Sequence, residues 1–199
     1  MAYIPFPYSG PALRACFWVS FGLWTAMETW VWLRERGGTA GANRDRGSRA
    51  WVVAAVWISL YGAFALMFQA PSGAIGFHPM AWFIAGIALE LAGVALRFSA
   101  VRTLGQFFRT SVIIQDTHRI ISHGPYRHLR NPSYTGATLT MAGLGLAMSN
   151  WYSLAVLVGG ILAAYARRIS VEQQALEAHF GQPYRDYMAS TWALIPYVW

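Results

Sequence analysis

The segment GQFFRTSVIIQDTHRIISHGPYRHLRNPSY, residues 105–134, is polar and rich in turn-forming residues, whereas the sequence on both sides is almost wholly apolar. It holds three of the five histidines of the chain and four arginines. Pro125 and Pro132 each fix φ and favour an extended conformation in the residue before them, and Gly124 permits a turn. We therefore expect a shaped binding segment here.

The composition of the whole chain is typical of a membrane protein. Hydrophobic residues make up 56% of the 199 residues and charged residues 12%, whereas soluble domains carry roughly 25% charged residues. All basic residues are arginine, and arginines flanking apolar spans are expected from the positive-inside rule, so the charge of +7 does not require a nucleic-acid partner. The single cysteine, Cys16, excludes an intramolecular disulfide, and no Cys/His cluster has metal-ligand spacing.

Five apolar stretches are candidates for membrane-spanning helices, which need about 20 residues. They are residues 12–33, 51–70, 80–96, 133–148 and 151–166. Asn150 marks a tight turn, so the last two spans must form an antiparallel hairpin. Gly136, Gly143 and Gly159 in these spans predict close helix contacts.

The sequence after Arg167 becomes amphipathic and predicts a C-terminal helix that Gly181 ends, followed by a short second helical piece. The expected fold of the chain, 1–199, is therefore a single all-α, polytopic membrane domain with about five transmembrane helices. Its functional region is expected at about residues 105–134 and 167–196.

The placement of arginine predicts the orientation in the membrane. With five spans, residues 34–49, 97–132 and 167–199 lie on one side, and they hold fourteen of the fifteen arginines. By the positive-inside rule this side is cytoplasmic, with the N-terminus outside and the C-terminus inside. The polar segment and the C-terminal helix then face the compartment that holds soluble cofactors.

The sequence RNPSY, residues 130–134, begins the fourth span and has two interpretations. Asn131 and Ser133 can cap the helix, and Pro132 suits its first turn. The same helix start has unpaired N–H groups that suit the carboxylate of a ligand. The residues alone favour neither interpretation.

Arg168 and Glu172 are four residues apart and share one helix face. An exposed pair of this kind usually contributes little. At the membrane exit of the fifth span, however, glutamate could attract a cation and arginine could bind a carboxylate in bidentate fashion. Glu28 and Glu90 are further candidates, because ionisable residues at membrane depth are often functional.

Taken in order, the motifs GPY, RNPSY, a hydrophobic hairpin, R-x-x-x-E, FGQPYRDY and a terminal IP resemble the isoprenylcysteine carboxyl methyltransferase family and its bacterial and archaeal relatives. Members of that family are integral-membrane enzymes that use S-adenosylmethionine. The resemblance covers roughly residues 80–199.

The resemblance also implies roles for individual residues. Cofactor-binding positions would be Gln115, His118, Arg119, Ile120, Ile121, Tyr126, Asn131, Pro132, Ser133, Tyr134 and Glu172. Arg168 matches a substrate-facing arginine, and with Glu172 it forms the expected catalytic pair. Asn131 replaces a common histidine and cannot take a proton as histidine can. Gln173 stands where the family usually has a second glutamate.

The implied function is methyl transfer from S-adenosylmethionine to a lipophilic acceptor, with S-adenosylhomocysteine as the product. By analogy the acceptor is a carboxylate, such as that of a prenylated molecule, and it would enter laterally between the spans. The expected partners are this acceptor and membrane lipids, and no nucleic acid. Two alternatives are methylation of a lipid amine or small thiol, and a non-catalytic membrane binding or transport protein.

Overall fold

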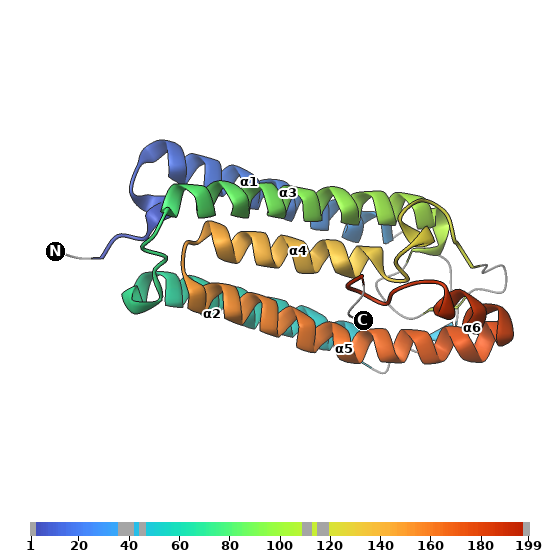
Figure 1. Cartoon of the computed structure of the whole chain (residues 1–199). Coiled ribbons are helices and arrows are strands. Elements are labelled where there is room, and N and C mark those ends of the chain that lie inside the picture. The colour runs from blue at the N-terminus through green and yellow to red at the C-terminus, as the bar shows by residue number, and fades with distance from the viewer. Residues whose placement is uncertain (1–2, 36–41, 44–46, 109–112, 115–119, 197–199) are drawn as a thin grey trace.

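The computed structural model describes residues 3–35, 42–43, 47–108, 113–114 and 120–196 (Figure 1). Within these ranges the α-helices are α1 (Pro11–Glu35), α2 (Ser48–Gln69), α3 (Pro79–Leu104), α4 (Pro132–Ala147), α5 (Trp151–Phe180) and α6 (Gln182–Ala189). Short 3₁₀ turns lie at Phe6–Tyr8, Pro71–Gly73, Gly105–Phe107 and Gly124–Arg127. The two-residue strands β1 (Ala42–Asn43) and β2 (Ile113–Ile114) form one antiparallel pair. The expected all-α class is confirmed.

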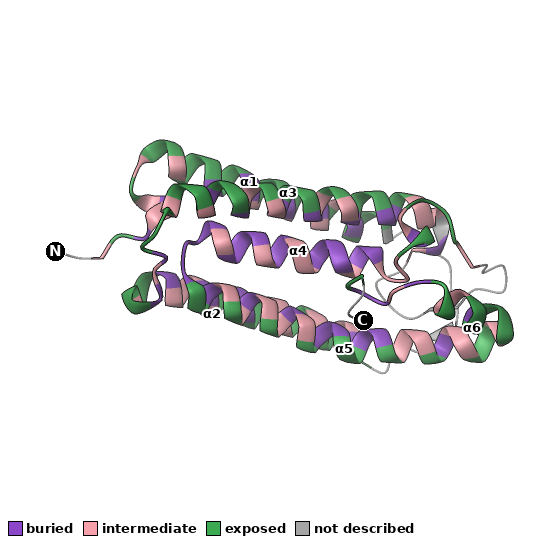
Figure 2. Cartoon of the chain, viewed as in Figure 1, coloured by how far each residue is buried: buried purple, intermediate pink, exposed green. Residues whose placement is uncertain are grey.

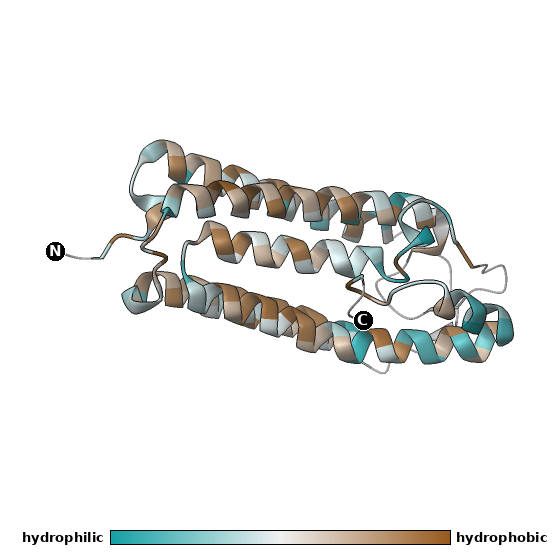
Figure 3. Cartoon of the chain, viewed as in Figure 1, coloured by the Kyte–Doolittle hydropathy of each residue, from teal (hydrophilic) through white to brown (hydrophobic). Residues whose placement is uncertain are grey.

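Helix α4 lies at the centre of the bundle, where it packs against α3 on one side and α5 on the other (Figure 1). Helix α1 packs on α3, and α2 packs on α5. Burial follows this arrangement, since α4 is mostly buried while α1, α2 and α3 are exposed on their outer faces (Figure 2). The exposed residues of these outer helices are largely apolar (Figure 3), as expected for helices that face lipid.

Helices α3 and α4 approach each other closely because glycines face each other across their contact. A Cβ on Gly93 of α3 would lie 2.5 Å from the carbonyl oxygen of Gly136 on α4. A Cβ on Gly136 would lie 2.7 Å from the backbone nitrogen of Arg97. The predicted packing role is confirmed for Gly136 and also for Gly143, whereas Gly159 has open space where its Cβ would be.

Three helices of the described chain, α2, α3 and α5, are long and apolar enough to cross a membrane. The predicted count of five spans is not confirmed. Helix α1 has 25 residues, but Arg14, Glu28 and the serine and threonine residues between them interrupt its apolar sequence. Helix α4 has 16 residues, or about 24 Å at roughly 1.5 Å per residue, which is shorter than a bilayer core of about 30 Å.

Two helices extend beyond the ends that hydrophobicity predicts. The third span was expected to end at residue 96, but α3 continues to Leu104. Helix α5 continues past 166 without a break to Phe180, where Gly181, with φ 61°, ends it as expected. A hydrophobicity pattern marks the part of a helix that contacts lipid. The helix itself can continue beyond that part, because its backbone hydrogen bonds also form in water. As a result one rigid helix carries both apolar core residues and the pair Arg168 and Glu172.

Candidate active site

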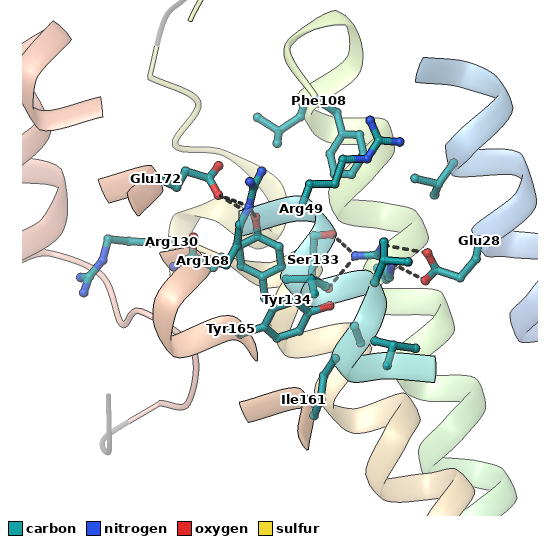
Figure 4. Close-up of a pocket in the computed structure, with 18 of the residues that line it drawn as sticks. Glu28, Arg49, Phe108, Arg130, Ser133, Tyr134, Ile161, Tyr165, Arg168 and Glu172 are labelled. Carbon is teal, nitrogen blue, oxygen red and sulfur yellow. Dashed lines mark hydrogen bonds and ion pairs between the residues drawn. The ribbon is translucent and has the colours of Figure 1, made fainter. Parts of the chain in front are cut away.

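A cavity of about 630 Å³ lies at the end of the bundle where α3 ends and α4 begins. Its walls come from α1 to α6 and from the segment 120–131 (Figure 4). This volume is within the range of about 300–1,000 Å³ that is typical of small-molecule sites. The cavity has a polar end and an apolar side, which are described in turn.

The polar end is built around Tyr134, in the first turn of α4. Its hydroxyl donates a hydrogen bond to Oε2 of Glu172 at 2.6 Å and accepts one from Nε of Arg168 at 3.0 Å (Figure 4). Nη1 of Arg168 also donates to Oγ of Ser48, at the start of α2, at 2.6 Å. The Tyr134 ring packs against Tyr165 with a centroid distance of 4.5 Å. We call Arg168, Tyr134 and Glu172 the Arg168 cluster.

A second polar cluster lies on the same cavity wall and ties three helices together. Arg97 of α3 donates to both carboxylate oxygens of Glu28 on α1, at 2.6 and 2.8 Å. Its remaining terminal nitrogen donates to Oγ of Ser133 on α4 at 2.8 Å. We call Arg97, Glu28 and Ser133 the Arg97 cluster. Glu28 was a candidate from the sequence, whereas Arg97 was not, because residue 97 was predicted to begin a cytoplasmic loop.

Tyrosines from the polar segment and α6 line the same end of the cavity. Tyr126 is 6% exposed and belongs to the turn Gly124–Arg127. Its carbonyl accepts a hydrogen bond from the hydroxyl of Tyr187 at 2.8 Å. Burial, reinforced by the carboxylate of Glu172, raises the pKa of Tyr126 well above its usual range. Burial also raises the pKa of Tyr187 to about 12. Both phenols are therefore neutral hydrogen-bonding groups at physiological pH.

The C-terminal residues 190–196 cross the end of the bundle and are hydrogen-bonded to the start of α4. Nδ2 of Asn131 donates to the carbonyl of Ala193 at 2.7 Å, and Oγ1 of Thr135 donates to the carbonyl of Leu194 at 2.7 Å. The side chain of Asn131 therefore does not cap α4, and that of Ser133 is bonded to Arg97 instead. The capping interpretation of these two side chains is wrong.

The apolar side of the cavity lies between α1 and α2. Its lining includes Phe21, Trp24, Trp32, Val52, Val53, Val56, Trp57 and Leu60. Trp24 and Leu60 are buried, whereas Trp57 is 68% exposed on the outer surface of α2. The cavity lining thus reaches from the protein interior to the apolar outer surface of the helices.

Most of the site residues predicted from the sequence lie around this one cavity. Those that line it are Ile120, Ile121, Tyr126, Asn131, Ser133, Tyr134, Arg168 and Glu172. Pro132 is buried in the first turn of α4 but is absent from the lining. Gln115, His118 and Arg119 lie outside the described residues, and their predicted contacts stay predictions.

Sequence reasoning missed several lining residues, including Arg97, Tyr165, Tyr184 and Tyr187. The two tyrosines of α6 belong to the motif FGQPYRDY, so the motif itself was the available signal. Tyr165 is three residues before Arg168 on α5, which places it on the same helix face.

Comparisons with known proteins identify the family and fold of the chain. A family model described as phospholipid methyltransferase matches residues 81–183, which include most of α3 and all of α4 and α5. A probable protein-S-isoprenylcysteine O-methyltransferase of Oryza sativa subsp. indica is 28% identical over 121 residues, which are 59% of this chain and 63% of the rice protein. Protein-S-isoprenylcysteine O-methyltransferase A of Arabidopsis thaliana is also 28% identical over 121 residues, with 59% and 61% covered. The chain thus spans less than two thirds of the length of these relatives.

The fold is similar to that of the eukaryotic intramembrane Ras methyltransferase ICMT (isoprenylcysteine carboxyl methyltransferase). The TM-score is 0.61 at 25% identity, and the match covers 73% of this chain and 52% of the other. Together with the apolar helices, this likeness identifies an integral membrane protein. The resemblance to isoprenylcysteine methyltransferases that the motifs predicted is therefore confirmed, and the chain belongs to the phospholipid methyltransferase family.

Proposed function

We propose that this chain transfers a methyl group from S-adenosylmethionine to the carboxylate of a lipophilic, prenylcysteine-like acceptor within the membrane. One observation carries the proposal: a single cavity joins the Arg168 cluster to an apolar side between α1 and α2. Relatives named protein-S-isoprenylcysteine O-methyltransferase support the choice of acceptor.

The acceptor would lie across both parts of the cavity. Its hydrocarbon tail would occupy the apolar side, where contact with residues such as Trp24 and Val56 removes apolar surface from water. Its carboxylate would reach Arg168, whose planar guanidinium is suited to bidentate binding of a carboxylate. An acceptor of this shape can enter from lipid without crossing water.

The residues of the polar end fit S-adenosylmethionine as the methyl donor. Glu172 offers a carboxylate, 30% exposed at its side chain, to the positively charged end of the donor. Ile120 and Ile121 provide apolar surface, and the rings of Tyr184 and Tyr187 provide aromatic surface. When bound, S-adenosylmethionine supplies a methyl group on a sulfonium, which is already an activated carbon.

The chain itself would contribute alignment and exclusion of water. Positive charge on the donor is lost in the displacement, so a water-poor cavity that holds the two reactants in line favours it. Arg168 would position the acceptor oxygen, and Tyr134 would link that arginine to Glu172. No general acid or base is required, because a carboxylate is already a nucleophile.

We further propose that the cavity faces the cytoplasm and that the N-terminus is outside. Arg34, Arg49, Arg102 and Arg127 belong to helix ends and turns near the cavity, whereas Arg14 is near the start of α1 at the other end (Figure 1). The positive-inside rule favours this orientation. S-adenosylmethionine would then enter from the side on which it is soluble.

The test begins with the full chain in lipid nanodiscs. Equilibrium binding of S-adenosylmethionine is measured first, and then transfer of its labelled methyl group to N-acetyl-S-farnesylcysteine. Matched probes are the methyl ester of that compound, in which the carboxylate is blocked, N-acetylcysteine without a tail, and phosphatidylethanolamine. We expect transfer to N-acetyl-S-farnesylcysteine alone, with a product that releases methanol in base.

Two results would reject the proposal in different ways. Binding of S-adenosylmethionine with transfer only to phosphatidylethanolamine would assign a lipid amine as the acceptor. If the folded protein does not bind S-adenosylmethionine, the proposed methyltransferase activity is rejected and a binding or transport protein is favoured.

A further inference from the structure

A second apolar groove, separate from the candidate active site, lies between α1 and α3. Its volume is about 320 Å³, and its lining consists of Met27, Trp30, Leu91, Val94, Ala95 and Phe98. None of these residues lines the larger cavity. Leu91 is 38% exposed and Phe98 39% exposed, so the groove opens on the outer, lipid-facing surface of the bundle.

Two arginines mark one end of this groove. Trp30 and Phe98 pack with their ring centroids 5.0 Å apart. The guanidinium carbon of Arg34 lies 5.3 Å from the centroid of Trp30, and that of Arg102 lies 5.6 Å from the centroid of Phe98. Each arginine follows its ring by four residues, and α1 and α3 run in the same direction (Figure 1). Both cations therefore stand beyond the same end of the groove.

The environment of these two arginines leaves them able to bind an anion. Both are exposed. Among residues whose side chains the structure describes, no carboxylate forms an ion pair with either guanidinium. A guanidinium held over an aromatic ring by its charge still has N–H donors that can hydrogen-bond a phosphate.

An apolar groove that ends at two cations has the shape and charge of a site for an anionic amphiphile. We infer that the groove binds an acyl chain of an anionic phospholipid, whose phosphate is held between Arg34 and Arg102. A zwitterionic lipid with the same tails would bind less well, because its headgroup ammonium is repelled by the same two guanidiniums. The inference does not depend on the proposed methyl transfer.

Such a lipid would act at the junction of α1 and α3. The second apolar groove lies between the same two helices that the Glu28–Arg97 ion pair connects, and Phe98 directly follows Arg97. A ligand that binds only the folded chain stabilises it by RT ln(1 + L/Kd), where L is the free lipid concentration, so the stabilisation grows as L rises above Kd. The expected consequence is an increase in thermal stability that anionic lipid causes and zwitterionic lipid does not.

The test uses the full chain in delipidated detergent micelles. Melting temperature is measured during titration with dioleoyl phosphatidylglycerol, dioleoyl phosphatidylcholine or inorganic phosphate. We expect a melting temperature that rises with the logarithm of lipid concentration above Kd, with phosphatidylglycerol only. In the double variant Arg34→Gln/Arg102→Gln the apparent affinity should fall about 10- to 30-fold, given roughly 1 kcal/mol for each arginine near an anionic lipid surface. Arg14→Gln, an exposed arginine near the other end of α1, is the matched control and should bind as the wild type does.

A second variant fills the groove without changing charge. Ala95→Trp substitutes an exposed lining residue and should abolish the response to phosphatidylglycerol. The inference is overturned if phosphatidylcholine stabilises as much as phosphatidylglycerol, if inorganic phosphate gives the same shift, or if the double variant keeps its affinity. It is also overturned if Arg14→Gln loses affinity equally, or if Ala95→Trp converts a dimer into a monomer, which would identify a second copy of the chain as the occupant.

Discussion

Arg97 and Arg168 are both buried arginines on the wall of one cavity, and the structure shows a different set of hydrogen bonds for each. Both carboxylate oxygens of Glu28 accept hydrogen bonds from Arg97, at 2.6 and 2.8 Å. Arg168 donates to the hydroxyls of Ser48 and Tyr134, and the carboxylate oxygen of Glu172 is 3.9 Å from its Nε. A guanidinium already matched bidentately by a carboxylate is suited to hold helices together. Arg168 lies at the polar end of the cavity, where the carboxylate of the proposed acceptor would reach its guanidinium.

The two clusters meet at consecutive residues of α4. Ser133 belongs to the Arg97 cluster and Tyr134 to the Arg168 cluster. Successive residues on a helix point about 100° apart, so the short sequence Pro132-Ser133-Tyr134 sends one side chain to each arginine. Substitutions of the two arginines and of these two α4 residues should separate a structural role from a functional one. The four positions are Arg97, Arg168, Ser133 and Tyr134.

The largest effect is expected from Arg168→Lys. Lysine keeps the charge but cannot bind a carboxylate in bidentate fashion. We expect turnover of N-acetyl-S-farnesylcysteine to fall about 10²- to 10³-fold, the usual cost of losing one well-placed donor at a reacting oxygen. Binding of S-adenosylmethionine, measured by calorimetry, should be unchanged.

Arg185→Lys is the matched control for this change. Arg185 forms an exposed ion pair with Glu177 at 3.3 Å, close to the same end of the bundle. It should leave turnover unchanged, because exposed pairs contribute little. Wild-type turnover in Arg168→Lys, or an equal loss of S-adenosylmethionine affinity, would exclude the carboxylate-binding role of Arg168.

Arg97→Met should act mainly on stability. It leaves the carboxylate of Glu28, which is 33% exposed, without its cation. Breaking a buried pair costs about 3–5 kcal/mol, and partial exposure of Glu28 reduces the expected loss to about 2–3 kcal/mol of unfolding free energy. Denaturant unfolding in detergent measures it. Adding Glu28→Gln should restore part of the loss, and failure of that second change to help would show that the ion pair is not the cause.

The contrast between the clusters explains which part of the site the sequence could predict. Arg168 and Glu172 are four residues apart on one helix, so local periodicity alone places them together. Glu28 and Arg97 are 69 residues apart, and only the packing of α1 on α3 brings them into contact. Asn131 and Ala193 are separated by 62 residues, so the amide of Asn131 could not be assigned to the C-terminal segment from spacing.

The helix ends show a similar limit of sequence reasoning. The spans were predicted from hydrophobicity, which located the cores of α2, α3 and α5 correctly. From their polar composition, residues 97–104 were predicted as part of a loop and residues 167–180 as a separate C-terminal helix. In the structure they extend α3 and α5, respectively. These extensions carry Arg97, Arg168 and Glu172, so the functional region lies where the hydrophobic signal ends and the helices do not.

Tyr134→Phe should have an intermediate effect on turnover. It removes the hydroxyl that links Arg168 to Glu172 and keeps the ring that packs on Tyr165. Hydrogen bonds to charged groups contribute about 1.5–3 kcal/mol, so a loss of about tenfold or more in turnover is expected. Single-turnover kinetics and S-adenosylmethionine affinity should both be measured. Unchanged values in both would show that Arg168 and Glu172 act independently of Tyr134.

Ser133→Ala should have the smallest effect. Whether it changes stability or turnover is as informative as the size of the change. Arg97 loses its hydrogen bond to the hydroxyl of Ser133 but keeps both bonds to Glu28. We expect a loss of about 1.5 kcal/mol in unfolding free energy, the low end for a hydrogen bond to a charged group, and unchanged turnover for each folded molecule. The change should have almost no effect in an Arg97→Met background, because its partner is then absent. If Ser133→Ala instead lowers turnover as Tyr134→Phe does, the two clusters act on the acceptor as one unit and the division between a structural and a functional arginine is wrong.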